Sequence, residues 1–122
     1  MPKYLLPAAL FTIGFAAPVS AGEADVLSAD IRLDANGTYT ISVEVEHADD
    51  GWDHYADGWE VLAPDGTVLA TRVLAHPHVN EQPFIRSKSG IEIPIDVQEV
   101  SLRAHDLVHG HGGKEITIAV PR

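Results

Sequence analysis

The chain has 122 residues, of which 45% are hydrophobic and 21% charged, and its formal net charge is −10 at pH 7. This acidic balance argues against nucleic acid and anionic membrane surfaces as partners, because both repel a strongly negative protein. The sequence contains no cysteine. Disulfides and thiolate chemistry are therefore excluded, and a bound metal would need imidazole, carboxylate or backbone ligands.

The first 21 residues have the pattern of an export signal. Lys3 gives a positive start, residues 5–17 form an apolar run, and Val19-Ser20-Ala21 is a small-residue cleavage pattern. The run is shorter than the about 20 residues that a membrane-spanning helix needs. We therefore expect a signal peptide at residues 1–21 and one periplasmic or secreted domain at residues 22–122. This domain carries 18 acidic and 7 basic side chains, a formal charge of −11.

Seven short segments of the domain have the composition or the two-residue alternation of β-strands. Turn-forming residues separate several of them, including Asn36-Gly37 and Pro64-Asp65-Gly66. No helical period and no internal repeat is present. The sequence therefore predicts an all-β, seven-stranded β-sandwich of immunoglobulin-like or fibronectin-like kind. The expected strands are residues 27–33, 39–45, 59–63, 68–74, 84–95, 100–105 and 116–120.

Histidine is distributed unevenly over the connections between these strands. Consecutive loops of a sandwich alternate between its two ends, so the second, fourth and sixth connections should share one end. A hairpin turn at Ser87–Gly90 would move the sixth connection to the opposite end, whereas Pro94 favours a single bent strand over residues 84–95. All seven histidines lie in or beside these three connections: His47, His54, His76, His78, His105, His109 and His111.

Histidines that converge in this way can bind a metal ion together, and imidazole suits both Zn²⁺ and Cu²⁺. A single loop histidine is more often solvated than ligating, so the prediction depends on the convergence of three loops. Asp106 and Glu81 either orient ligand rings by accepting the second ring proton or are surface charges. The predicted metal ligands are His54, His76, His78, His105, His109 and His111.

Aromatic residues are concentrated between Gly51 and Trp59. Trp59 opens a predicted strand and is expected in the core, like the tryptophan of the third strand in immunoglobulin-like sandwiches. Trp52 and Tyr55 lie in the preceding loop, where they either form a binding surface or cover the end of the core.

Three runs of sequence resemble a group of small exported bacterial β-sandwich proteins of unassigned function. These runs read GWDHYAD at residues 51–57, HPHxxEQPF at residues 76–84 and RAHDxxHGxGG at residues 103–113. The likeness covers most of residues 22–122. It implies a shared fold and an exported location but no particular activity.

The leading hypothesis is a periplasmic metal-binding module that holds Zn²⁺ or Cu²⁺ through histidines at one end of the sandwich. The alternative from another class is a non-catalytic recognition domain that binds a partner protein or a glycan through the same loops. An enzyme ranks third, because no Ser–His–Asp spacing is favoured and no general base can be named for a hydrolytic metal site.

Overall fold

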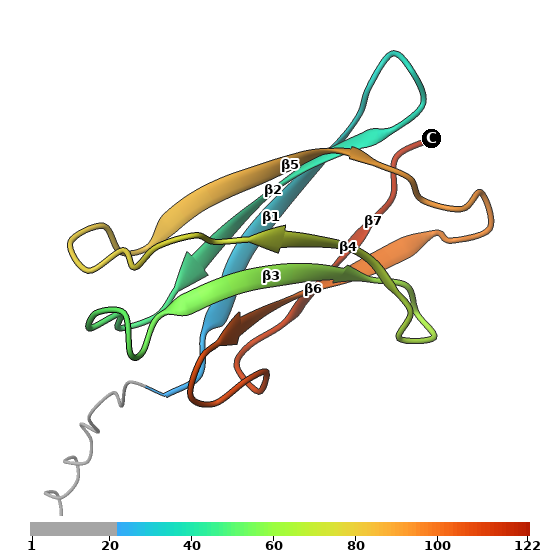
Figure 1. Ribbon diagram of the computed structural model, residues 1–122. Coiled ribbons are helices and arrows are strands. Elements are labelled where there is room, and N and C mark those ends of the chain that lie inside the picture. Colours follow the sequence, from blue (N-terminus) through green and yellow to red (C-terminus); the bar gives the residue numbers. More distant parts are fainter. Residues whose placement is uncertain (1–21) are drawn as a thin grey trace, which may run out of the picture.

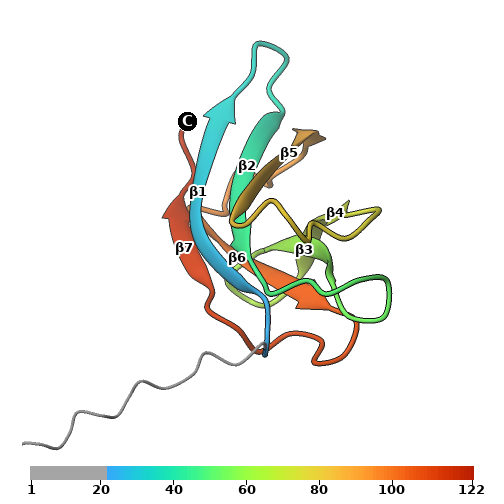
Figure 2. The ribbon, with the colours of Figure 1, turned by 90° about the vertical axis from the view of Figure 1, so that its left-hand side faces the viewer.

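A computed structural model describes residues 22–122, and the predicted signal peptide at residues 1–21 lies outside the described residues. Seven strands form two antiparallel sheets packed as a sandwich (Figures 1 and 2), so the predicted all-β, seven-stranded sandwich is confirmed. No helix in the described part of the chain is long and apolar enough to cross a membrane. The strands are β1 (Asp25–Leu33), β2 (Tyr39–Glu46), β3 (Ala56–Leu62), β4 (Val68–Val73), β5 (Phe84–Ile91), β6 (Glu99–Asp106) and β7 (Ile116–Ala119).

The two sheets have the strand orders β1-β2-β5 and β4-β3-β6-β7. The fourth strand pairs with β3, whereas in constant-type immunoglobulin domains it pairs with the fifth strand. β3 and β6 are therefore the central strands of the four-stranded sheet. Their register pairs Ala56 with Asp106, so the start of β3 lies beside the end of β6.

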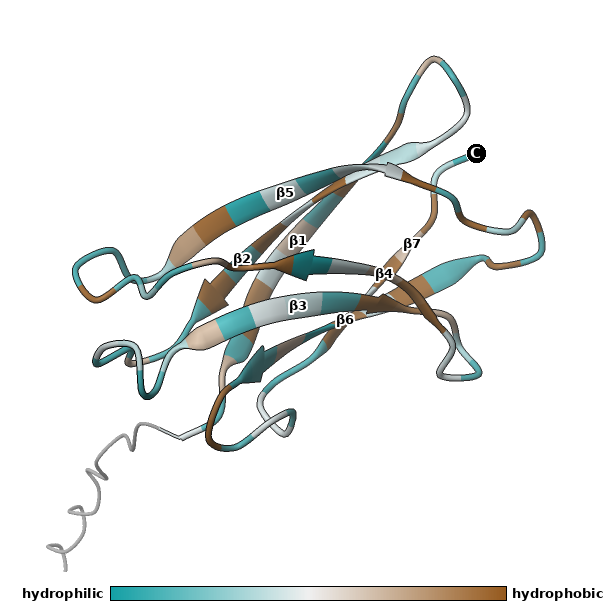
Figure 3. Ribbon diagram, viewed as in Figure 1, coloured by the Kyte–Doolittle hydropathy of each residue, from teal (hydrophilic) through white to brown (hydrophobic). Residues whose placement is uncertain are grey.

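The core lies between the sheets and is built largely from buried apolar residues of β2, β3 and β6, with partly buried residues of β4 and β7 packed against it. In β2, Ile41, Val43 and Val45 are fully buried, and Trp59 of β3 is buried as predicted. Burial of each such side chain contributes roughly 1.5–3 kcal/mol relative to leaving it exposed. Figure 3 shows the resulting alternation of polar and apolar residues along the strands.

β5 is a single strand that contains the ambiguous segment Ser87–Gly90. A register shift opposite Tyr39 and Ile41 accommodates the extra residue, and Gly90 has a φ of 72°, a left-handed conformation that glycine adopts without strain. The segment is thus a bend and not a hairpin turn. Because β5 crosses the sandwich once, as predicted, the β6–β7 loop lies at the same end as the β2–β3 and β4–β5 loops.

Two strand boundaries differ from the sequence prediction by three residues or more. β5 ends at Ile91 and not at residue 95, because Pro94 has no N–H for a ladder and its carbonyl accepts a hydrogen bond from the N–H of Val97 in a turn. β3 begins at Ala56, three residues earlier than predicted, because pairing with β6 extends beyond Trp59 through a bulge.

The connections β2–β3, β4–β5 and β6–β7 lie at one end of the sandwich, on the left in Figure 1. This end is formed by residues 47–57, 74–83 and 105–115, and we call it the histidine pole. All seven histidines belong to it, as the alternation of loops predicts.

The β6–β7 loop packs against the backbone at the start of β1. Val26 donates its N–H to the carbonyl of Lys114 at 2.9 Å, and Lys114 donates its N–H to Oδ1 of Asp25 at 2.7 Å. Gly113 faces the carbonyl of Ala24 so closely that a Cβ there would collide with it. These contacts hold the loop, and the histidines that it carries, on the end of the sandwich.

We expect Gly113→Ala to lower the free energy of unfolding by about 1–3 kcal/mol, because backbone atoms cannot move aside as a flexible side chain can. Urea denaturation measures this change. The matched control is Glu115→Ala at a neighbouring exposed position, which should change stability by less than about 0.5 kcal/mol. Equal stabilities of the two variants would contradict the close packing at Gly113.

Candidate metal centre at the histidine pole

Two strands carry polar side chains into the interior at the histidine pole. β2 buries every second residue up to Val45, and His47 continues this alternation beyond the strand end. β6 buries Leu102 and Ala104 in the same way and ends at Asp106. The side chains of His47 and Asp106 are both fully buried, so the two strands place an imidazole and a carboxylate in the interior of the sandwich.

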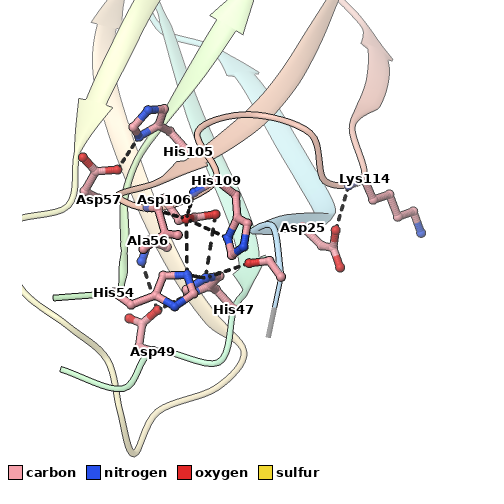
Figure 4. A network of polar contacts seen from close by, with 12 residues as sticks. Asp25, His47, Asp49, His54, Ala56, Asp57, His105, Asp106, His109 and Lys114 are labelled. Carbon is pink, nitrogen blue, oxygen red and sulfur yellow. Dashed lines mark hydrogen bonds and ion pairs between the residues drawn. The ribbon is translucent and has the colours of Figure 1, made fainter. Parts of the chain in front are cut away.

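His47, His54 and Asp106 bring three donor groups to one point (Figure 4). Nε2 of His54 lies 3.1 Å from Nε2 of His47 and 3.3 Å from Oδ1 of Asp106. Nε2 of His47 lies 3.8 Å from Oδ2 of Asp106. Ligand atoms around a tetrahedral metal ion with bonds of about 2.0–2.1 Å are about 3.3 Å apart. The spacing of the three groups therefore fits a single ion.

Asp49 orients the ring of His47. Its Oδ1 accepts a hydrogen bond of 2.6 Å from Nδ1 of His47, which places the proton of a neutral ring on that nitrogen. The lone pair then lies on Nε2, which faces His54 and also the carbonyl oxygen of Gly22 at 3.2 Å. A carboxylate on the outer nitrogen is the usual partner of a metal-bound imidazole.

Asp49 also fixes the loops around the cluster. Its Oδ1 accepts the N–H of Ala56 at 3.0 Å, where β3 begins, and its Oδ2 accepts the N–H of His78 at 2.7 Å in the β4–β5 loop. The side chain is fully buried. One carboxylate thus joins the end of β2, the start of β3 and the β4–β5 loop.

Asp106 carries a negative charge into the interior. Burial raises the pKa of its carboxyl, but the N–H groups of His109 and Val108 on Oδ1, at 2.7 and 2.9 Å, and the charges of His47 and His109 outweigh burial and hold the pKa below its usual value. Its Oδ2 has no hydrogen-bond partner within residues 22–122. Burial of a carboxylate costs free energy unless it has a partner, and a positively charged group beside Oδ2 would offset this cost.

His109 lies on the solvent side of the cluster. Its Nδ1 is 3.3 Å from Oδ1 of Asp106, and its ring centroid is 5.0 Å from that of His54. The side chain is 34% exposed, whereas His47 and Asp106 are fully buried. A modest movement of the exposed ring would bring it to the fourth position around an ion.

His105 and His111 lie on another face of the same sheet. Because side chains alternate along β6, His105 points away from the interior, into which its neighbour Asp106 points. Nδ1 of His105 is 2.6 Å from Oδ1 of Asp57, and Nε2 of His111 is 3.2 Å from Oε1 of Glu60. Figure 4 shows His105 and Asp57 apart from the buried group.

His76 and His78 form a third group in the β4–β5 loop, with ring centroids 4.7 Å apart. His78 is buried and stacks on Phe84 at 4.0 Å, and burial, followed by the charges of Arg86 and His76, lowers the pKa of its ring. Nδ1 of His76 lies 3.1 Å from the carbonyl of Pro77. Of this pair, His78 packs against the end of the core and His76 is exposed.

Glu81, predicted to orient a ligand ring, and Trp52 and Tyr55, predicted as a binding surface, lie outside the three-donor group. Glu81 forms an ion pair with Arg86 at 3.2 Å, and the hydrogen bond from Arg86 holds the pKa of its carboxyl below the usual value. Trp52 is 66% exposed in the β2–β3 loop, and its ring meets that of Tyr55 edge to face at 5.7 Å.

The structure thus divides the six predicted ligands into three pairs: His54 with His109, His105 with His111, and His76 with His78. It adds His47, which was not predicted as a ligand, and places Asp106, predicted only to orient a ring, among the donor groups. The alternation of buried residues in the two strands, continued by one further step, indicates both residues. This signal is present in the sequence.

Comparison with known proteins gives one informative match. The sequence is 38% identical over 96 residues to a protein of Halomicrobium mukohataei described as "Putative lipoprotein". The match covers 79% of this chain and 47% of that protein, so the chain spans about half the length of the relative. No family model matches the sequence, and no solved structure matches it significantly.

We expect Asp49→Ala to lower the free energy of unfolding by at least about 3 kcal/mol, because three buried donors lose their acceptor. Chemical denaturation at neutral pH with a chelator present measures this change without any contribution from bound metal. Asp50→Ala, at the adjacent exposed position, is the control and should be within about 0.5 kcal/mol of the parent protein. A similar loss of stability in both variants would contradict the role assigned to Asp49.

Proposed function

We propose that this chain is a metal-binding module of the cell envelope that holds Zn²⁺ or Cu²⁺ in the interior of the histidine pole. The ligands are Nε2 of His47, Nε2 of His54 and the carboxylate of Asp106, with His109 in the fourth position. The observation that carries the proposal is the buried Oδ2 of Asp106, which has no hydrogen-bond partner among residues 22–122 and faces an imidazole nitrogen.

With neutral rings, the acceptor atoms at this point repel one another unless a cation lies between them. Nε2 of His47 bears a lone pair once its Nδ1 has donated to Asp49, and it faces the carbonyl oxygen of Gly22, which can only accept. A metal ion is attracted to all of these donors at once. Nitrogen and oxygen donors of this kind suit Zn²⁺ and Cu²⁺, and a tetrahedral arrangement suits Zn²⁺ in particular.

A location in the cell envelope agrees with two observations. Residues 1–21 have the pattern of an export signal, and the relative from Halomicrobium mukohataei is described as "Putative lipoprotein". A domain without cysteine suits such a location, because neither its fold nor its metal ligands depend on thiol oxidation state.

The enclosed position of the centre favours retention of a metal over hydrolysis. His47 and Asp106 are fully buried, and His54 is 16% exposed, so an ion held by them meets solvent only beside His109. A catalytic metal needs an open position for water or substrate. Storage, delivery or stabilisation by the metal therefore fits this geometry better than catalysis.

A second candidate function is recognition of a partner protein or a glycan by the β2–β3 and β6–β7 loops. Trp52, Leu107 and Val108 expose 66%, 46% and 59% of their surface at the histidine pole. Exposed aromatic residues are common in binding surfaces. Because Trp59 is buried, ligand-dependent quenching of the exposed tryptophan fluorescence should disappear in Trp52→Phe, and unchanged emission with candidate glycans would count against this function.

We expect Zn²⁺ or Cu²⁺ to raise the melting temperature by about 10–20 °C at a free concentration 100 times the Kd, which corresponds to about 2.7 kcal/mol. Thermal unfolding at pH 7.5 with metal and with chelator measures the shift. The shift should become small near pH 5, because ligand imidazoles must be unprotonated and their reference pKa is about 6.5.

The shift should disappear in His54→Ala and in Asp106→Asn, the second of which keeps an acceptor for the N–H groups of the loop. His76→Ala is the matched control, because His76 is an exposed histidine of the same pole outside the cluster. It should retain the full shift. An unchanged melting temperature of the parent protein in saturating metal, without precipitation, would eliminate the proposed function.

A further inference from the structure

We infer that the outer face of the four-stranded sheet holds a second metal site, in which His105 and His111 bind one divalent transition-metal ion that stays accessible to solvent. The probe that suits it best is Cu²⁺, which binds imidazole most tightly among the common divalent ions. This site shares no ligand with the buried centre of the proposed function, so either can exist without the other.

The two rings are spaced for a shared ion. Their centroids are 4.9 Å apart and their planes are inclined at 70°. Two imidazoles that bind one ion through bonds of about 2.1 Å have centroids roughly 5 Å apart, close to the observed separation. The Nε2 atom of His105 points toward the β6–β7 loop, since it is the heavy atom nearest to a Cβ built at Gly110.

Each ring has a carboxylate on the nitrogen that would face away from the ion. Asp57 lies 2.6 Å from Nδ1 of His105, and Glu60 lies 3.2 Å from Nε2 of His111. Because Nδ1 of His105 is hydrogen-bonded to Asp57, the lone pair of a neutral His105 ring lies on Nε2, whereas Glu60 approaches His111 without forming a hydrogen bond. Arg103 holds Glu60 in place through a 2.8 Å bond from its Nε. The Asp57–His105 pair repeats the Asp49–His47 pair of the buried centre, with the same Nδ1 to carboxylate distance.

A hollow of about 370 Å³ lies in front of these side chains. Gly58 lies between Val73 of β4 and His105 of β6 in the register of the sheet, and its missing side chain leaves the space open. The hollow has room for an ion together with water or a small ligand. The side chains of His105 and His111 are 39% and 33% exposed, so an ion here would exchange faster than one in the buried centre.

The charge around the hollow favours a cation. Two carboxylates, Asp57 and Glu60, outnumber the single guanidinium of Arg103, and the whole chain has a formal charge of −10. The neighbouring Glu60 does not need to become a ligand, because outer carboxylates raise the basicity of the imidazoles that they contact.

The test is the number of Cu²⁺ ions that the purified protein binds, measured by equilibrium dialysis and metal analysis, with electron paramagnetic resonance of the bound Cu²⁺. The parent protein should bind two ions. His105→Ala and His111→Ala should each bind one and keep the metal-dependent thermal shift. His54→Ala should lose the shift but still bind one ion, with a spectrum showing nitrogen coupling. Asp57→Asn should weaken the outer ion about 10–100-fold and leave the buried ion unchanged.

His76→Ala controls for unspecific binding to exposed histidines, and it should still bind two ions. Binding of one ion that His54→Ala removes and His111→Ala retains would overturn the second site and leave the proposed function intact. Binding of one ion with the reverse pattern would support the second site and overturn the proposed function. A loss of Cu²⁺ in His76→Ala as large as in His105→Ala would overturn the second site as a specific one.

Discussion

The buried carboxylate of Asp49 is the contact on which the histidine pole depends. It accepts hydrogen bonds from the His47 ring and from the N–H groups of Ala56 and His78, which belong to three different segments of the chain. Without this acceptor, three donors would be buried without partners, at about 1–3 kcal/mol for each. The same bonds that hold the loops together also direct Nε2 of His47 toward Asp106. Stability and the donor geometry of the candidate centre therefore have a common origin.

The alternation of side chains along β6 explains how two separate groups of histidines lie at the same pole. Because neighbouring side chains of a strand point to opposite faces, β6 presents His105 on the outer face and Asp106 in the interior. The β6–β7 loop then supplies His109 to the inner group and His111 to the outer group. A shift of the β6 register by one residue would turn each β6 side chain to the opposite face and separate the members of both groups. The pairing of Ala56 with Asp106 fixes this register.

The sequence predicts most of the fold because its strands alternate clearly and its turns have definite chemistry. It also predicts that the seven histidines lie at one end of the sandwich. This placement depends only on the number of chain crossings, which the clear strands define. It does not predict how the histidines divide among three faces, because that depends on single-residue features such as the bulge between Ala56 and Gly58. His47 and Asp106 lie just beyond the ends of predicted strands, where the sequence prediction assigns loops, although the buried alternation continues into both residues.

In the proposed buried centre, protons and a metal ion would compete for the same lone pairs. Within residues 22–122, the ion-pair partners of Asp49 and Asp106 are imidazoles, so neutralising these two charges requires either protonated rings or a bound cation. Protonation of His47 would supply a positive charge beside Asp49 and Asp106. Its Nε2–H would then face Nε2 of His54, which would need to carry a lone pair to accept that proton. A metal ion can instead contact both rings and the carboxylate together. Above the pKa of free imidazole, where ring protons are costly to hold, a metal ion would be the better counter-charge.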